Sequence, residues 1–184
     1  MKKIVLKAKV KSYDDFEKNL DEIGKDLAPI IWQHDRVFVP RGYKRGMNFP
    51  KIIMRTEMKA VDRPAQYEMI LRRHVEDSGI DIIESTVVKD YVDSVNIIYQ
   101  LGFKNIAEVS RRRQIADLGE GIKIYLDKID NLNGYYAKME MVLRDEDVVA
   151  EVRDDMKKTF RDVFKIEKFV EQSYFEILEE NEHK

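Results

Sequence analysis

Cysteine is absent from the 184-residue chain, and histidine is scarce. Without a thiol the protein can form neither a disulfide nor a thiolate metal site, and it has no cysteine nucleophile. The three histidines are far apart in the sequence and show no spacing typical of a metal site. These absences leave carboxylates as the side chains available to hold a metal ion.

Long apolar runs and a large excess of one charge are missing too. No stretch is long and apolar enough to predict a transmembrane helix, and the N-terminus runs directly into an alternating pattern with no apolar signal segment. We therefore expect a cytoplasmic protein with no membrane partner. The net charge of −2 gives no reason to expect a nucleic-acid partner, and any attraction for an anion must come from local clustering of charge.

The length predicts a single domain over residues 1–184. Apolar residues make up 43% of the chain, which is enough for a core, while charged residues reach 37%. A helical bundle can carry that much charge on its outside, and a barrel can carry it in a charged lumen. The sequence shows no internal repeat and no linker that would divide the chain.

Period-two alternation is the main pattern in the chain. Between residues 3 and 10 the even positions are apolar, whereas positions 3, 7 and 9 are lysines, which predicts a strand. The same reasoning predicts strands over 51–59, 66–74, 80–88, 107–115, 121–126 and 135–143, and two apolar pieces around 30–32 and 37–39. Helical spacing predicts helices over 12–24, 90–101, 147–164 and 170–180. Helices that interrupt antiparallel strands indicate the α+β class.

Most of these strands have one apolar face and one face of long charged side chains. A one-sided sheet with its charged face in water gives this pattern. A closed or nearly closed antiparallel β-barrel with helices packed outside gives it too, because the charged faces then line the lumen. Ten basic and four acidic residues would line that lumen: Lys3, Lys7, Lys9, Arg55, Glu57, Lys59, Arg72, Glu84, Arg111, Arg113, Lys123, Asp127, Lys138 and Glu140.

A net-basic lumen has a consequence for the ligand. Buried like charges are costly unless they stay hydrated or are paired, so such a lumen must hold water or a polyanion. The planar fork of arginine binds phosphate oxygens in pairs, and the carboxylates could hold a hard divalent cation beside the phosphates. The barrel interpretation therefore predicts a phosphate-rich ligand.

Short motifs in the order of the chain resemble the CYTH (triphosphate tunnel) family, which includes class IV adenylyl cyclases, thiamine triphosphatases and inorganic triphosphatases. The family's N-terminal ExExK corresponds to KIVLK at 3–7, where Lys7 is kept, and Met54-Arg55 and Leu71-Arg72 are loosely similar to the middle strands. The later matches are LGF at 101–103, VSRRR at 109–113, IYLD at 124–127, GYYAKME at 134–140 and SYFEIL at 173–178. Because they span nearly the whole chain, they favour the barrel over the one-sided sheet.

The resemblance implies a ligand, a cofactor and roles for particular residues. The ligand would be a triphosphate, a nucleotide or polyphosphate, and the cofactor Mg²⁺ or Mn²⁺. By position, the phosphate-binding residues would be Lys7, Arg55, Arg72, Arg111 and Arg113, the catalytic residue Asp127, and the metal ligands Glu84, Glu140 and Asp127.

Three departures from the family pattern weaken the expected metal site. Lys3 and Val5 replace the two leading glutamates, and Lys138 replaces the first glutamate of the later ExE pair. A lysine in place of a carboxylate removes a metal ligand and repels the cation. Three hypotheses follow. The first is a metal-dependent triphosphatase or adenylyl-cyclase-like enzyme with altered or reduced activity. The second is a non-catalytic nucleotide- or polyphosphate-binding module. The third is an interaction protein that forms a homodimer.

Overall fold

The structure is a computed structural model that describes residues 1–44, 47–60, 62–75 and 79–182. Within these residues, eight antiparallel strands close into a barrel in the order β1-β5-β4-β3-β2-β6-β7-β8. The prediction of an antiparallel barrel in the α+β class is confirmed. The strands are β1 (Lys2–Val10), β2 (Ile31–Pro40), β3 (Lys51–Met58), β4 (Gln66–Val75), β5 (Ile80–Val88), β6 (Phe103–Gly119), β7 (Ile122–Ile129) and β8 (Tyr135–Val142).

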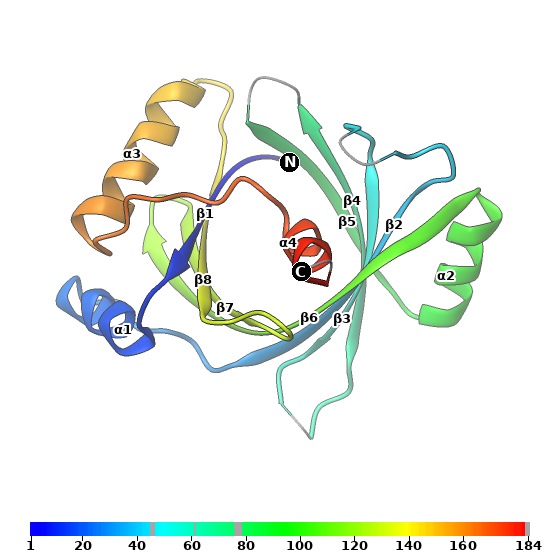
Figure 1. The fold of residues 1–184 in the computed structure, drawn as a ribbon, viewed down its shortest axis with the longest axis horizontal. Helices are drawn as coiled ribbons and strands as arrows, with labels where there is room; N and C mark the ends of the chain where they lie inside the picture. The colour runs from blue at the N-terminus through cyan, green and yellow to red at the C-terminus, as the bar shows by residue number, and fades with distance from the viewer. Residues whose placement is uncertain (45–46, 61, 76–78, 183–184) are drawn as a thin grey trace.

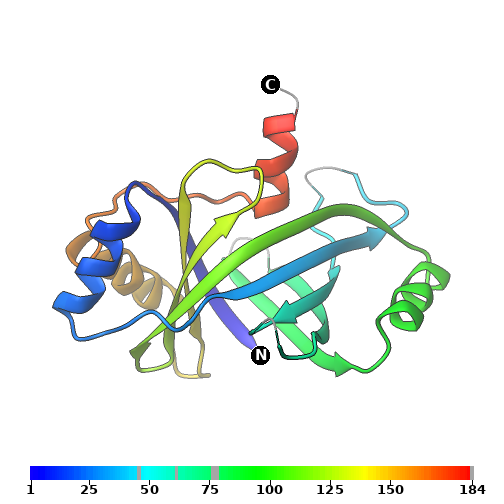
Figure 2. The same ribbon diagram turned by 90° about the horizontal axis from the view of Figure 1, so that it is seen from below.

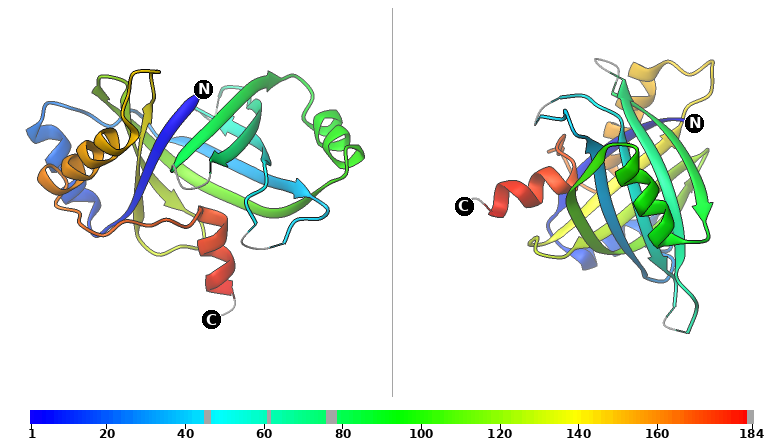
Figure 3. Two further views of the ribbon diagram at one scale, coloured as in Figure 1. Left: turned by 90° about the horizontal axis from the view of Figure 1, so that it is seen from above. Right: turned by 90° about the vertical axis from the view of Figure 1, so that its right-hand side faces the viewer.

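The helices are α1 (Tyr13–Glu22), α2 (Tyr91–Gln100), α3 (Val149–Asp162) and α4 (Tyr174–Glu182). Figure 1 looks down the barrel, with α1 and α3 outside one wall and α2 outside the opposite one. Helix α4 lies over the opening, and Figure 2 shows that it projects beyond this end of the barrel. The side views in Figure 3 show the same arrangement.

The main apolar core lies outside the barrel wall because the apolar strand faces point outward. Ile4 and Ala8 of β1 pack with Phe16 of α1 and with Met156 and Phe160 of α3. A second cluster lies beneath α2 and joins Phe38 and Met54 to Val95 and Ile98. Since these clusters take up the apolar faces, the charged faces of the strands are left to line the lumen.

The start of α1 has a well-formed N-cap. Ser12 has extended backbone angles, and its hydroxyl accepts a hydrogen bond from the Asp15 N–H at 3.2 Å. Tyr13 and Phe16 then begin the helix, and the buried Phe16 and Leu20 face the barrel. The cap thus satisfies a free N–H group at the point where the chain leaves β1.

We expect Ser12→Ala to destabilise the protein by about 1 kcal/mol, because the Asp15 N–H loses its acceptor. Ser12→Gly is the matched variant and should cost only a few tenths of a kcal/mol. Urea denaturation of both variants measures the free energies of unfolding. Equal values for Ser12→Ala and the wild type would show that the cap contributes nothing.

The C-terminal segment completes the seam between β1 and β5. Strand β1 pairs with β5 at Lys2, Lys3 and Ile4. Beyond this point the same edge of β1 meets the C-terminal segment, where Phe169 bridges to Ala8 and the Val170 N–H donates to the Lys7 carbonyl at 2.7 Å. The segment therefore fills the open part of the seam and brings α4 to the mouth of the barrel.

Several predicted boundaries differ from the structure. The apolar pieces around 30–32 and 37–39 form one strand, β2, and β6 is longer than the predicted 107–115. The last helix begins at Tyr174, not near 170, because the preceding residues pair with β1. It covers the mouth of the barrel, whereas we expected the helices to pack on the outer wall. None of the helices in the described part of the chain is long and apolar enough to cross a bilayer.

Candidate functional site: a charged lumen under the C-terminal helix

Asp35 of β2 is the centre of the first ion-pair group in the lumen. Its carboxylate accepts from Arg55 Nε of β3 at 2.8 Å and from a terminal nitrogen of Arg111 of β6. Gln33 accepts from Arg111 Nε at 2.9 Å and donates to Glu57 at 2.7 Å. Burial alone would raise the pKa of Asp35, but Arg111 and Arg55 hold it below its ordinary value. Both arginines are thus already paired.

Asp127 of β7 is the centre of the second group, and it is fully buried. Arg113 of β6 binds it with two parallel hydrogen bonds of 2.6 and 2.7 Å. The hydroxyl of Tyr174, from α4, donates to the same carboxylate at 2.8 Å. Burial opposes the charged form, yet Arg113 keeps the pKa of Asp127 below its ordinary value. Burial and the Asp127 charge raise the pKa of Tyr174 well above its ordinary value, so its hydroxyl stays a donor.

Glu140 of β8 lies between two lysines. Lys3 Nζ is 3.1 Å and Lys138 Nζ 2.5 Å from its carboxylate, and the Tyr125 hydroxyl donates to it at 3.1 Å. Burial, followed by the nearby Arg113, lowers the pKa of Lys138 to about 7. Burial would raise the pKa of Glu140, but Lys138 and Lys3 hold it below its ordinary value. Glu140 therefore balances two ammonium groups.

Three cations gather near α4, at the mouth of the barrel. Lys51 of β3 and Arg72 of β4 are directly opposite each other in the register. Lys7 of β1 and Lys51 lie against the rings of neighbouring residues of α4, Tyr174 and Phe175. Burial, followed by repulsion from Arg72, lowers the pKa of Lys7 to about 8. Burial also lowers the pKa of Lys51. We call Lys7, Lys51 and Arg72 the mouth cluster.

Carboxylates balance part of the charge of the mouth cluster. Asp81 of β5 is buried and accepts from Arg72 at 2.5 Å, and His74 lies 3.1 Å from its other oxygen. Glu176 of α4 accepts from the backbone N–H and the hydroxyl of Ser173, both at 2.6 Å. Its negative charge partly opposes the effect of burial, which lowers the pKa of Lys7 and of Lys51. Neither of these lysines makes an ion pair within 4 Å in the described part of the chain.

Helix α4 covers this end of the lumen with aromatic side chains. The Tyr174 ring lies 5.4 Å from Lys7 Nζ and 5.9 Å from the Arg111 guanidinium. Lys51 Nζ lies 4.6 Å from the centre of the Phe175 ring. Lys7 also donates to the carbonyl of Gln172, just before the helix. The C-terminal segment thus contacts the cations through ring faces, a carbonyl and the Glu176 charge.

The structure brings most of the predicted site residues together in the lumen. These are Lys7, Arg55, Arg72, Arg111, Arg113, Asp127 and Glu140. Their functions as phosphate ligands, metal ligands or catalytic residue stay predictions. The expectation that Glu84 lines the lumen is wrong, because Asp81 faces inward with Arg72 and the unbroken register of β5 then turns Glu84 outward.

The predicted Mg²⁺ or Mn²⁺ site does not fit the donors that are present. Such ions need several oxygen ligands in one place. Glu140 is held between Lys3 and Lys138, Asp127 is saturated by Arg113 and Tyr174, and Glu84 faces outward. Among the described residues, no three His, Cys, Asp or Glu side chains form a group that could hold a metal ion.

The structure also changes the set of residues that line the lumen, since three further carboxylates face inward. Asp35 and Asp81 were missed, and so was Glu68, which lies opposite Arg55 and 3.8 Å from it. Lys51 was missed too, although it alternates with Arg55 along β3 and the period-two pattern could have identified it. With Lys51 added and Glu84 removed, the expected ten bases and four acids become eleven bases and six acids. The excess of bases therefore remains, but the four inward arginines are each paired with a carboxylate.

Comparisons with known proteins agree with this fold. No protein-family model matches the chain, and no curated protein matches it significantly by sequence. The PH1819 protein of Pyrococcus horikoshii has a similar structure, with a TM-score of 0.83, 18% identity and coverage of 97% of this chain and 99% of that one. A candidate adenylate cyclase from Vibrio parahaemolyticus gives a TM-score of 0.80 at 19% identity, covering 96% and 97% of the two chains.

A third similar structure has a lower TM-score. The candidate adenylyl cyclase HpAC1 from Hippeastrum, described as having a dominant triphosphatase activity, gives a TM-score of 0.63 at 12% identity, covering 98% and 95% of the two chains. At these identities the likeness shows the fold. The eight-stranded antiparallel barrel that the sequence resemblance implied is therefore confirmed, both by the strand order and by these similar structures.

Proposed function

We propose that the barrel lumen binds a triphosphate-containing or polyphosphate ligand, and that the mouth cluster is where the phosphates first bind. The observation that carries this proposal is the gathering of Lys7, Lys51 and Arg72 in a partly buried place. Directly opposed like charges destabilise a sheet, and buried ammonium groups lose hydration. An anionic ligand that contacted all three would offset both costs. Phosphate oxygens suit both side-chain types, since arginine binds them in pairs and lysine as a point charge.

The deeper arginines supply a second set of contacts in this proposal. Arg55, Arg111 and Arg113 are held by Asp35 and Asp127. A phosphate chain that extended inward would compete with these carboxylates for the same N–H donors. Each exchange replaces one charge-assisted pair with another, so the deeper residues would select ligand geometry more than they would add affinity.

Hydrolysis of a triphosphate, or a nucleotidyl cyclase reaction, is the second candidate function. It is favoured by the triphosphatase activity described for HpAC1 and by the place of Asp127 and Glu140 in the lumen. The test is release of phosphate or pyrophosphate from tripolyphosphate and ATP with Mg²⁺ or Mn²⁺. Because the carboxylates are already paired with cations, we favour binding over hydrolysis. Metal-dependent turnover of either substrate would instead favour hydrolysis.

Lys51→Gln should weaken tripolyphosphate binding about tenfold at low salt, because one charge-assisted contact is lost. Lys51 has no ion-pair partner within 4 Å among the described residues, so the change leaves no carboxylate unpaired there. Calorimetric titration in EDTA measures the affinity, which should also fall as salt is added.

Arg73→Gln is the matched control for that titration. Arg73 is exposed and follows Arg72 on the same strand, so its side chain lies on the outer face of the barrel. Its removal should leave the affinity unchanged. An equal loss in Arg73→Gln and Lys51→Gln would mean that overall charge, and not the mouth cluster, binds the phosphates.

A further inference from the structure

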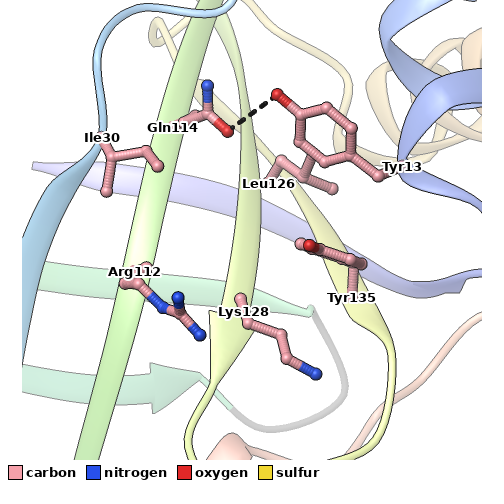
Figure 4. A pocket seen from close by; sticks show the side chains of 7 residues that line it. All are labelled: Tyr13, Ile30, Arg112, Gln114, Leu126, Lys128 and Tyr135. Atoms are coloured by element: carbon pink, nitrogen blue, oxygen red, sulfur yellow. Dashed lines mark hydrogen bonds between the residues drawn. The ribbon is translucent and has the colours of Figure 1, made fainter.

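A separate hollow of about 200 Å³ lies on the outer wall of the barrel, beside the start of α1 (Figure 4). It is lined from β6, β7 and β8 by side chains that include Arg112, Gln114, Lys128 and Tyr135. Arg112 and Gln114 alternate along β6 with Arg111 and Arg113, which face the lumen, so the wall itself separates the two sites. A ligand in this hollow would touch none of the lumen groups described above.

Two cations occupy one end of the hollow, and neither has a carboxylate partner among the described residues. Arg112 and Lys128 are directly opposite each other in the β6–β7 register, and Figure 4 shows them extending in the same direction. Arg112 is exposed and makes no hydrogen bond or ion pair with any described residue. Lys128 donates to the carbonyls of Leu132 and Gly134 at 3.2 and 3.1 Å. Opposed like charges destabilise a strand pair, and an anion bound between them would remove that cost.

Aromatic and aliphatic groups form the rest of the hollow. The Tyr13 and Tyr135 rings are 5.4 Å apart with an angle of 52° between their planes. The side chain of Leu126 lies below Tyr13, and Ile30 lines the opposite side (Figure 4). The Tyr13 hydroxyl donates a hydrogen bond to the side-chain oxygen of Gln114 at 3.2 Å. The hollow is therefore basic at one end and suited to a flat apolar group at the other.

We propose that this outer hollow binds a small anion that carries one aromatic ring, an aryl carboxylate or an aryl phosphate. The anionic group would lie between Arg112 and Lys128, and the ring would pack against Tyr13, Tyr135 and Leu126. The size agrees with one ring, because pockets for drug-sized ligands measure about 300–1,000 Å³. A wider hollow of about 710 Å³ shares Arg112 and Lys128 and opens the basic end to solvent.

The acidic residues near this site leave the two cations unbalanced. Glu108 lines the wider hollow, but it is paired with Arg36 at 3.1 Å and lies 3.5 Å from His34. Glu17 lies 3.1 Å from the Tyr13 hydroxyl, at the apolar end. Asp130 lines the wider hollow and is exposed, and it makes no ion pair with either cation among the described residues. The anion site thus keeps its positive charge.

The only tryptophan of the chain gives a direct readout. Trp32 lies opposite Arg112 in the β2–β6 register and is 38% exposed. Titration of benzoate and of phenyl phosphate should change Trp32 fluorescence and raise the melting temperature. Acetate and inorganic phosphate lack the ring and should leave the Trp32 fluorescence unchanged, although phosphate bound at the mouth cluster would itself raise the melting temperature. A preference between the two aryl probes distinguishes the carboxylate from the phosphate form of the ligand.

Three variants decide the proposal. Arg112→Gln should lower the affinity for the tighter-binding of the two aryl probes about tenfold. Without a probe, this variant should melt at or above the wild-type temperature because the like-charge pair is gone. Arg73→Gln, another outer-face arginine, and the lumen variant Lys51→Gln should bind that probe as the wild type does. The proposal is overturned if neither aryl probe binds, if the ring-free anions bind equally well, or if Arg112→Gln retains full affinity.

Discussion

Asp127→Asn is expected to lower the free energy of unfolding by about 3–5 kcal/mol, because it leaves the Arg113 guanidinium buried without a counter-charge. Asp127 is fully buried, and Arg113 has 4% of its side chain exposed. For a domain whose total stability is about 5–15 kcal/mol, this is a large share. Urea denaturation measures the difference. Glu84→Gln is the matched control, since this exposed, outward-facing carboxylate should change stability by less than about 0.5 kcal/mol.

A second variant keeps this prediction testable if Asp127→Asn does not fold. The combined change of Arg113→Met, Asp127→Leu and Tyr174→Phe removes the buried charges and the hydroxyl that bonds to them. Replacement of a buried ion pair by apolar groups of similar size is often neutral, so this protein should fold. If Asp127→Asn is as stable as the wild type, the Arg113–Asp127 pair does not have the structural function assigned to it.

Raising the pH from 7 to 9 is expected to stabilise the wild-type protein, and Lys138→Met should remove much of the gain. The pKa of Lys138 is about 7 in the folded protein and 10.5 ordinarily. At pH values between these two, Lys138 is protonated in the unfolded chain and deprotonated in the folded protein, so the free energy of unfolding rises with pH. One such proton contributes up to about 1.4 kcal/mol per pH unit. Below pH 7 both states are protonated and the contribution ends.

The measurement is urea denaturation of both proteins at pH 6, 7, 8 and 9. Lys7, with its pKa of about 8, contributes to the rise in both proteins, so the comparison concerns the difference between the two slopes. Glu140 keeps Lys3 and Tyr125 as partners in the variant. Parallel curves would mean that Lys138 titrates alike in the folded and unfolded states, which contradicts its burial beside Arg113.

The faces of most strands could be predicted from the sequence because each has one apolar side. In β1 the lysines at odd positions correctly indicated the lumen, and the apolar even positions indicated the contact with α1 and α3. Strand β5 was ambiguous because Ile80, Ile82 and Ile83 put apolar residues on both faces. The choice of Glu84 over Asp81 as the inward acid followed from that ambiguity, and the pairing with β1 and β4 decides it.

Other parts of the site depend on contacts between distant segments. Asp35 was missed because β2 was interpreted as two apolar pieces. Without a continuous strand, the residues between the pieces could not be assigned to the inner or the outer face of the sheet. The Tyr174 contact with Asp127 joins residues 47 positions apart. No local pattern indicates that the last helix would cover the lumen, because that position results from pairing between Phe169 and Ala8. The pairing of each predicted arginine with a carboxylate likewise depends on the closed barrel.

Calorimetric titration of tripolyphosphate in EDTA, repeated with Mn²⁺, tests the central claim most directly. We expect binding in EDTA, because the mouth cluster supplies the positive charge and the carboxylates are engaged by lysine and arginine. Mn²⁺ should leave the affinity unchanged or lower it by competing for the phosphates. Binding that appears only with Mn²⁺ would contradict this account and would mean that Asp127 and Glu140 rearrange to build a metal site.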